Sequence, residues 1–224
     1  MSYNSLQKIQ CAGLAGEVGQ VYSEQMLSAL RGRGLEIYWR DNNYWPSEEE
    51  YNQMVEDKVG GMFYLGVRLM QLFSDDKNNY SKVTKLLALY FQIRNDYFQL
   101  KQREAVDSVT ETSRVDDLGG RISLPIIHAL RASQGTELQN RLRRPVKDVK
   151  AKQYFLSELE RLGSFEYTRD VLLNIDLQAR GEVDRLGGNP EMEYVLDELL
   201  AWRTLGRQSK YEVNIREQFN INKI

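Results

Sequence analysis

The chain has 224 residues, of which 42% are hydrophobic and 28% charged, with a net charge of −2 and a single cysteine. This length supports one substantial core and predicts a single domain over residues 1–224. The near-neutral charge and scattered Lys and Arg residues argue against nucleic-acid binding, and no apolar run approaches the roughly 20 residues of a membrane span. The lone Cys11 and an N-terminus without a signal-peptide pattern predict a cytoplasmic protein.

The first third of the chain predicts helices. Only four Pro residues occur in the chain, and most segments repeat apolar residues at helical spacing, which predicts an all-α fold. Residues 5–29 have this periodicity, but internal glycines leave open whether they form one helix or two. The run RGRG, residues 31–34, predicts a break. Ser47 and Glu50 then form the pattern of a capping box, which begins a long helix to about Phe73.

The remainder of the chain predicts further helices around a long polar loop over residues 106–120. Loops of this length in compact domains are usually functional or disordered. The residues before Pro190 predict a helix boundary, and the tail after about residue 206 is expected to fray. The predicted architecture is therefore a helical bundle. The expected helices cover residues 81–104, 124–132, 149–162, 167–186 and 190–205.

The stretch FQIRNDY places an amide and a carboxylate side by side in an apolar helix. Oxygen-bearing side chains that share one face of such a helix suit magnesium, which needs few protein carboxylates when phosphate supplies further ligands. A solvent-exposed helix face explains the same pattern, and taken alone the pattern favours that explanation. The side chains on this face are Gln92, Asn95, Asp96 and Gln99.

Lys58 lies within an otherwise apolar helix face, so we expect an anionic partner for it. A phosphate would serve, because lysine is a compact point charge often used on phosphates. The alternative is that its aliphatic stem packs while the ammonium group reaches water, which is the more common arrangement. The neighbouring Gly60 and Gly61 indicate either close packing by another helix or room for a ligand.

His128 is the only histidine of the chain. It lies in the apolar run LPIIHAL, within a predicted helix. This setting favours a core histidine with its hydrogen bonds satisfied over a general base.

The chain resembles the short-chain trans-prenyl diphosphate synthases, and geranylgeranyl diphosphate synthases in particular. The resemblance covers about residues 6–202 and only the C-terminal two thirds of a full-length member. It implies an isoprenoid-synthase-type all-α bundle, truncated at its N-terminus relative to the family. It also implies a homodimer or higher oligomer that couples an allylic prenyl diphosphate to isopentenyl diphosphate with magnesium. The matching runs are GLEIYWRDN, PSEEEY, MVEDKVGGMF, LMQLFSD, YFQIRNDY, ISLPIIHAL, GSFEYTR and GGNP.

The resemblance implies a diphosphate-binding role for three residues. Lys58 matches the diphosphate-binding Lys of the family, and Gln92 matches a family Gln. Arg121 stands where the family carries Lys, which keeps the charge but changes its geometry. Two departures weaken the match: Val59 replaces a Thr, and residues 32–36 read GRGLE where the family usually has GQGxD.

The metal ligands that the resemblance implies are more strongly altered. Asp96 matches the second Asp of the family's acidic pair, but Asn95 replaces the first, and Gln99 stands where Asp or Asn is usual. The family's other metal motif, of DDxxD type, belongs to a helix upstream of this sequence and does not occur in residues 1–224. The expected cofactor is therefore magnesium at a weakened site.

These departures remove ligands while the core segments are kept. The leading hypothesis is an impaired or inactive relative that acts as a dimerisation or regulatory partner, as a heteromer with a complete prenyl diphosphate synthase. One alternative is a fragment or isoform of an active geranylgeranyl diphosphate synthase. Another is a terpene synthase derived from this family, because Asn95 and Asp96 resemble the start of the motif NDxxSxxxE. Gln99 and Arg103 depart from that motif.

Overall fold

The computed structural model describes residues 14–105, 122–133, 138, 140 and 149–200. These residues form helices and no strand, which confirms the predicted all-α fold. The predicted loop at 106–120 and the tail after 206 lie outside the described residues. The elements are α2 (Ala15–Asp41), α3 (Glu48–Val55), the π-turn η1 (Glu56–Gly60), α4 (Gly61–Gln71), α5 (Ser81–Ala105), α6 (Leu124–Ala132), α8 (Val149–Arg161), α9 (Ser164–Arg185) and α10 (Pro190–Leu199).

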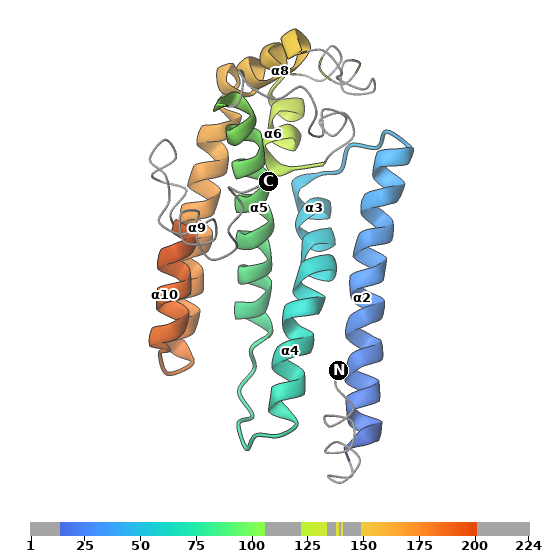
Figure 1. Cartoon of the computed structure of the whole chain (residues 1–224), viewed down its shortest axis with the longest axis vertical. Coiled ribbons are helices and arrows are strands. Elements are labelled where there is room, and N and C mark those ends of the chain that lie inside the picture. Colours follow the sequence, from blue (N-terminus) through green and yellow to red (C-terminus); the bar gives the residue numbers. More distant parts are fainter. Residues whose placement is uncertain (1–13, 106–121, 134–137, 139, 141–148, 201–224) are drawn as a thin grey trace, which may run out of the picture.

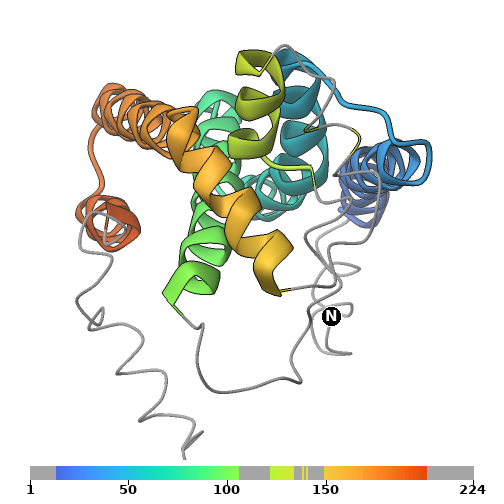
Figure 2. The ribbon, with the colours of Figure 1, turned by 90° about the horizontal axis from the view of Figure 1, so that it is seen from above.

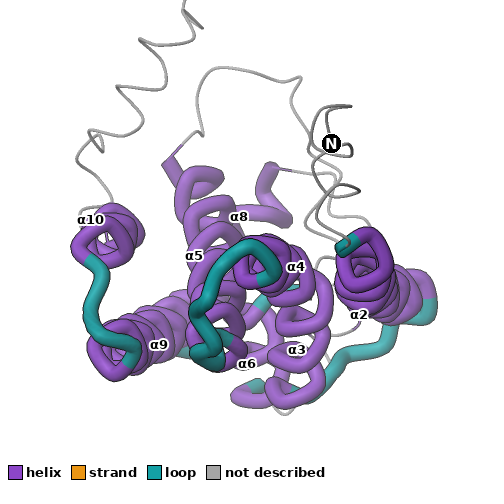
Figure 3. Tube along the Cα trace, turned by 90° about the horizontal axis from the view of Figure 1, so that it is seen from below, coloured by secondary structure: helices purple, strands orange, loops and turns teal. Residues whose placement is uncertain are grey.

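The long helices lie side by side, and α6 and α8 lie at one end of them (Figures 1 and 2). Seen from below, α2 occupies one edge of the array and α10 the other (Figure 3). α5 lies between the α3–α4 stretch and α9, and it contacts both. None of the described helices combines the length and the apolar character that a membrane span needs.

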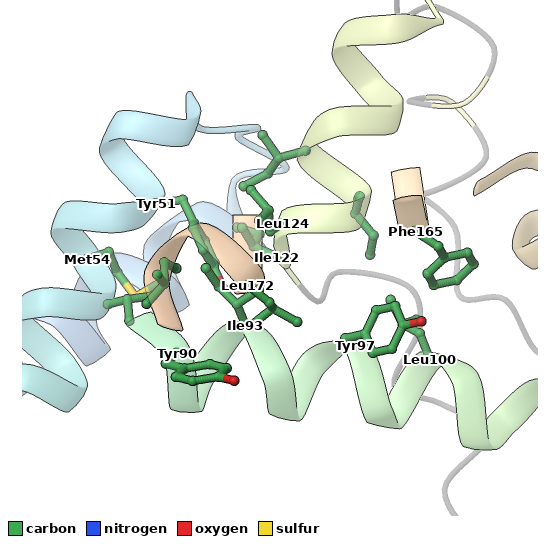
Figure 4. Packing of buried hydrophobic residues seen from close by; sticks show 14 of the residues in the cluster. Tyr51, Met54, Tyr90, Ile93, Tyr97, Leu100, Ile122, Leu124, Phe165 and Leu172 are labelled. Carbon is green, nitrogen blue, oxygen red and sulfur yellow. The ribbon is translucent and has the colours of Figure 1, made fainter. Parts of the chain in front are cut away.

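The core lies where α5 meets α3, α6 and α9 (Figure 4). Tyr90 and Ile93 of α5 are almost completely buried. Further along α5, the Tyr97 ring packs edge-on against Phe165 of α9, with ring centroids 5.8 Å apart. Burial of large apolar side chains supplies most of the stabilisation of such a bundle, at roughly 1.5–3 kcal/mol for each fully buried residue.

The capping box predicted at the start of α3 is confirmed. Ser47 Oγ accepts a hydrogen bond from the Glu50 backbone N–H at 3.1 Å, and Glu50 Oε2 accepts one from the Ser47 N–H at 2.7 Å. The helix then continues through η1 and α4 to Gln71, close to the predicted end at about Phe73.

The predicted break at residues 31–34 is wrong, because α2 runs through it without interruption. The helix crossing explains these glycines. A Cβ added to Gly32 would lie only 2.5 Å from the Lys58 backbone N, and one added to Gly61 would lie 3.1 Å from the Gln25 carbonyl oxygen. The backbones of α2 and of the η1–α4 stretch therefore approach closely, which confirms close packing at the glycine pair beside Lys58.

The π-turn η1 lies at this crossing. A π-turn has five-residue hydrogen-bond spacing and often occurs at functional sites. An extra residue in a helix rotates the following side chains by about 100° relative to a regular helix. Lys58 lies within η1, so the π-turn sets the direction in which this side chain leaves the helix.

We predict that Gly32→Ala destabilises the protein by about 1–3 kcal/mol, because the new methyl group would force α2 away from η1. Besides its contact with Lys58, this Cβ would lie 2.8 Å from the Met54 carbonyl oxygen. Urea unfolding followed by circular dichroism measures the change.

Gly34→Ala is the matched control, since a Cβ at Gly34 has no heavy atom within 4 Å among the described residues. This variant should be neutral or stabilising by about 0.5–1 kcal/mol through helix propensity. Equal effects of the two substitutions would contradict the close crossing.

Candidate functional site

The polar face predicted on α5 divides into a buried carboxyl group and an exposed amide. The Asp96 side chain is only 2% exposed. Its Oδ2 accepts hydrogen bonds from the Gln92 Nε2 at 3.0 Å and from the Tyr51 hydroxyl at 3.3 Å. Asn95 is exposed and Gln99 is half-buried. The solvent-exposed explanation therefore holds for Asn95 and is wrong for Asp96.

Tyr51 is a site residue that sequence reasoning missed. It lies in the first turn of α3, which the capping box begins, and its side chain is completely buried. A buried tyrosine needs a partner for its hydroxyl group, and a buried carboxyl group needs donors. The Tyr51 hydroxyl donates to Asp96 Oδ2, and this buried hydrogen bond joins α3 to α5.

Lys58 has the anionic partner that was expected, and it is a carboxylate of the chain itself. Lys58 Nζ lies 3.0 Å from Glu36 Oε1 of α2, and the other oxygen, Glu36 Oε2, lies 2.5 Å from Arg33 Nη1. The side chains of Lys58 and Glu36 are 16% and 20% exposed, whereas that of Arg33 is 60% exposed. The Lys58 ammonium group is therefore mostly buried in an ion pair.

The ionisation of Glu36 follows from its neighbours. Burial raises the pKa of its carboxyl group. Lys58 and Arg33 together lower the pKa by more than burial raises it, so it lies below the ordinary value. Glu36 is therefore ionised at neutral pH, and the three charged groups carry a net charge of +1. The predicted break at residues 31–34 concealed this residue, because Arg33 and Glu36 interact only on a continuous helix.

The described residues do not fit a magnesium clamp. Magnesium takes oxygen ligands in near-octahedral geometry. The Glu36 carboxylate already holds two cations, which leaves Asp96 as a single buried carboxylate whose Oδ2 accepts two hydrogen bonds. No group of three or more His, Cys, Asp or Glu side chains in the described part of the chain could hold a metal ion. Arg121, predicted to bind diphosphate, lies outside the described residues.

His128 is hydrogen-bonded within the fold, as predicted. Its Nδ1 lies 3.0 Å from Ser164 Oγ of α9, and its ring stacks on Tyr167 with centroids 4.3 Å apart. The Tyr167 hydroxyl donates to Glu48 Oε2 at 2.7 Å. Burial, with help from this hydrogen bond, raises the pKa of Tyr167 to about 12. These contacts join α6, α9 and α3.

A family model described as polyprenyl synthetase matches residues 1–159. The chain is 45% identical over 188 residues to a terpene synthase of Matsumurasca onukii, which covers 83% of this chain and 61% of that protein. It is 37% identical over 181 residues to a geranylgeranyl pyrophosphate synthase of Dictyostelium discoideum, covering 80% and 59%. A geranylgeranyl pyrophosphate synthase of Mucor circinelloides f. lusitanicus is 36% identical over 180 residues, covering 80% and 58%.

The chain belongs to the polyprenyl synthetase family, which confirms the resemblance read from its motifs. It spans about three fifths of the length of these curated relatives. The all-α architecture is that of the isoprenoid synthase bundle.

We predict that Tyr51→Phe destabilises the protein by about 1–3 kcal/mol, because it removes a hydrogen-bond donor from a buried carboxyl group. Thermal and urea unfolding measure the change. Tyr44→Phe is the control, since the Tyr44 hydroxyl donates to Glu50 at 3.0 Å on the surface. That variant should change stability by less than about 0.5 kcal/mol. A similar small effect at Tyr51 would show that Asp96 does not depend on it.

We also predict a pH dependence from His128. Burial is the largest influence on His128 and lowers its pKa in the fold. The nearby Glu48 raises this pKa and Arg131 lowers it, each by less than burial does. The unfolded chain therefore takes up the proton at higher pH than the folded chain. This contribution to stability is present above the ordinary pKa of about 6.5 and is lost as pH falls through the lower folded value.

His128→Gln removes the titration while keeping an amide that can bond Ser164. The free energy of unfolding, measured in urea at pH 7.5, 6.5 and 5.5, should fall less with acid in this variant than in the unmodified chain. Parallel losses in the two proteins would contradict a role for His128.

Proposed function

We propose that this chain is a prenyl-diphosphate-binding relative of the geranylgeranyl diphosphate synthases that transfers prenyl groups poorly or not at all by itself. In this proposal it acts in isoprenoid biosynthesis as a dimerisation or regulatory partner of a complete synthase. The observation that carries the proposal is the Asp96 carboxyl group, which is buried and hydrogen-bonded by Tyr51 and Gln92 beside an exposed Asn95.

The chemistry of prenyl transfer explains why this arrangement matters. The reaction ionises an allylic diphosphate, so the departing diphosphate must be neutralised in the transition state. In the family magnesium supplies most of that neutralisation. Each ~1.4 kcal/mol of lost stabilisation lowers the rate about tenfold. We assign diphosphate binding to Lys58, Gln92 and Arg121, and only weak metal contacts to Asp96, Asn95 and Gln99.

The outward face of α2 supports the partner role. Large apolar side chains are exposed along it, with Leu30 63% and Tyr38 58% exposed. Leu27 and Ile37 continue the same face, and Gly34 lies among them with open space around it. Exposed apolar patches of this kind mark protein interaction sites. A second prenyl synthase chain, either a copy of this one or a complete synthase, is the partner that we propose for it.

Two other functions have support. The 45% identity to a terpene synthase favours an enzyme that converts a prenyl diphosphate without isopentenyl diphosphate. The chain spans about three fifths of the length of its geranylgeranyl pyrophosphate synthase relatives. This supports the alternative that it is part of a longer, active geranylgeranyl diphosphate synthase. The genomic or transcript sequence upstream of Met1 tests this last alternative, since an in-frame DDxxD helix would supply the other metal motif.

We predict that the purified chain with magnesium, farnesyl diphosphate and isopentenyl diphosphate forms no geranylgeranyl diphosphate above background. Radiolabelled isopentenyl diphosphate and chromatography of the products measure this. Elongated product would contradict the proposal. A hydrocarbon or alcohol formed from farnesyl diphosphate alone would instead support the terpene synthase alternative.

Mixing with a complete geranylgeranyl diphosphate synthase completes this test. Light scattering should detect a heteromer with the unmodified chain, and Leu30→Asp should prevent it by placing a charge on the apolar face of α2. Two species that remain separate would remove the partner role.

A further inference from the structure

The ion cluster around Glu36 points to a way of binding diphosphate that does not need a metal. We propose that Arg33 and Lys58 together bind the diphosphate group directly, without magnesium, and that Glu36 holds both cations until the diphosphate displaces it. This binding mode rests on the proposed function, because it requires that a diphosphate ligand reaches Lys58.

The geometry of the cluster supports this mode. Each oxygen of the Glu36 carboxylate contacts a different cation, with Lys58 Nζ at 3.0 Å and Arg33 Nη1 at 2.5 Å. Two cations from separate elements thus converge on one anionic group. A phosphate group in the same place presents oxygens to both, and guanidinium and ammonium groups are the usual protein ligands of phosphate.

The electrostatics of the cluster favour exchange of the carboxylate for diphosphate. Glu36 supplies one negative charge against two positive charges, whereas a diphosphate supplies more than one. Lys58 is mostly buried, which strengthens its attraction for an anion relative to a solvent-exposed lysine. The Lys58 backbone packs against Gly32 of α2, which fixes the point from which the Lys58 side chain extends. Arg33 is largely exposed, so its side chain can reorient toward the ligand once Glu36 is displaced.

The sequence departures near the site agree with this mode. Arg33 stands where the resembling family has Gln, and Asn95 stands where it has Asp. Each change makes the local charge more positive by one unit, and Arg33 adds a donor for phosphate. Asn95 removes a carboxylate from the metal motif and Arg33 adds a cation, and both changes favour direct binding of an anion.

The test is isothermal titration of the full chain with inorganic pyrophosphate, once in EDTA and once in excess magnesium. Binding should occur in EDTA, with an affinity within about threefold of that in magnesium. Arg33→Gln should weaken binding in EDTA by about threefold to tenfold, a modest effect because the side chain is largely exposed. Glu36→Gln should strengthen it by about threefold to tenfold, since a competing negative charge is removed.

Arg40→Gln is the matched control. Arg40 is an exposed arginine on the same helix that pairs with its neighbour Asp41 at 2.9 Å, so its loss should leave pyrophosphate binding unchanged. Circular dichroism confirms that each variant is folded. The gain of affinity expected for Glu36→Gln provides a second safeguard, because misfolding cannot produce it.

A double variant separates a direct role of Arg33 from an indirect one. If Arg33 contacts pyrophosphate, Arg33→Gln weakens binding also in the Glu36→Gln background. No further loss there would overturn the direct role. Binding that requires magnesium would overturn the metal-free mode while leaving a diphosphate site in place. No binding in either condition would overturn the proposed function as well.

Discussion

At Gly32 the backbone of α2 lies directly against that of the π-turn η1, so closely that a Cβ there would be 2.5 Å from the Lys58 backbone N. The site depends on this contact. It keeps α2 beside η1, the stretch of helix among the described residues in which an extra residue redirects the side chains. It also brings Glu36 and Arg33 of α2 to the ammonium group of Lys58. Without a glycine at this position the two helices could not approach to this distance.

The acidic groups of the site act as internal partners. Asp96 Oδ2 accepts hydrogen bonds from Tyr51 and Gln92 and thereby joins α3 to α5. Glu36 forms ion pairs with both Lys58 and Arg33. This arrangement uses the carboxyl groups of the described helices to connect and stabilise the bundle. This use supports our proposal that the chain binds prenyl diphosphates and transfers prenyl groups poorly by itself.

Much of the fold could be predicted because its signals are local. The capping box of Ser47 and Glu50 marks the start of α3, and apolar periodicity locates α5 and α6 to within a residue. The RGRG prediction failed because glycine was read only for its helix propensity, a cost of about 0.5–1 kcal/mol per residue, which the helix crossing outweighs. Tyr51 and Glu36 were missed because their partners are 45 and 22 residues away in sequence, a pairing that periodicity does not encode.

The central proposal is that the carboxyl groups of the described helices do not assemble a metal clamp around a diphosphate. Electron paramagnetic resonance of the full chain, titrated with Mn²⁺ in the presence of pyrophosphate, counts the ions that each chain retains. The account predicts no more than the single ion that pyrophosphate itself carries. Three Mn²⁺ ions retained per chain would contradict it.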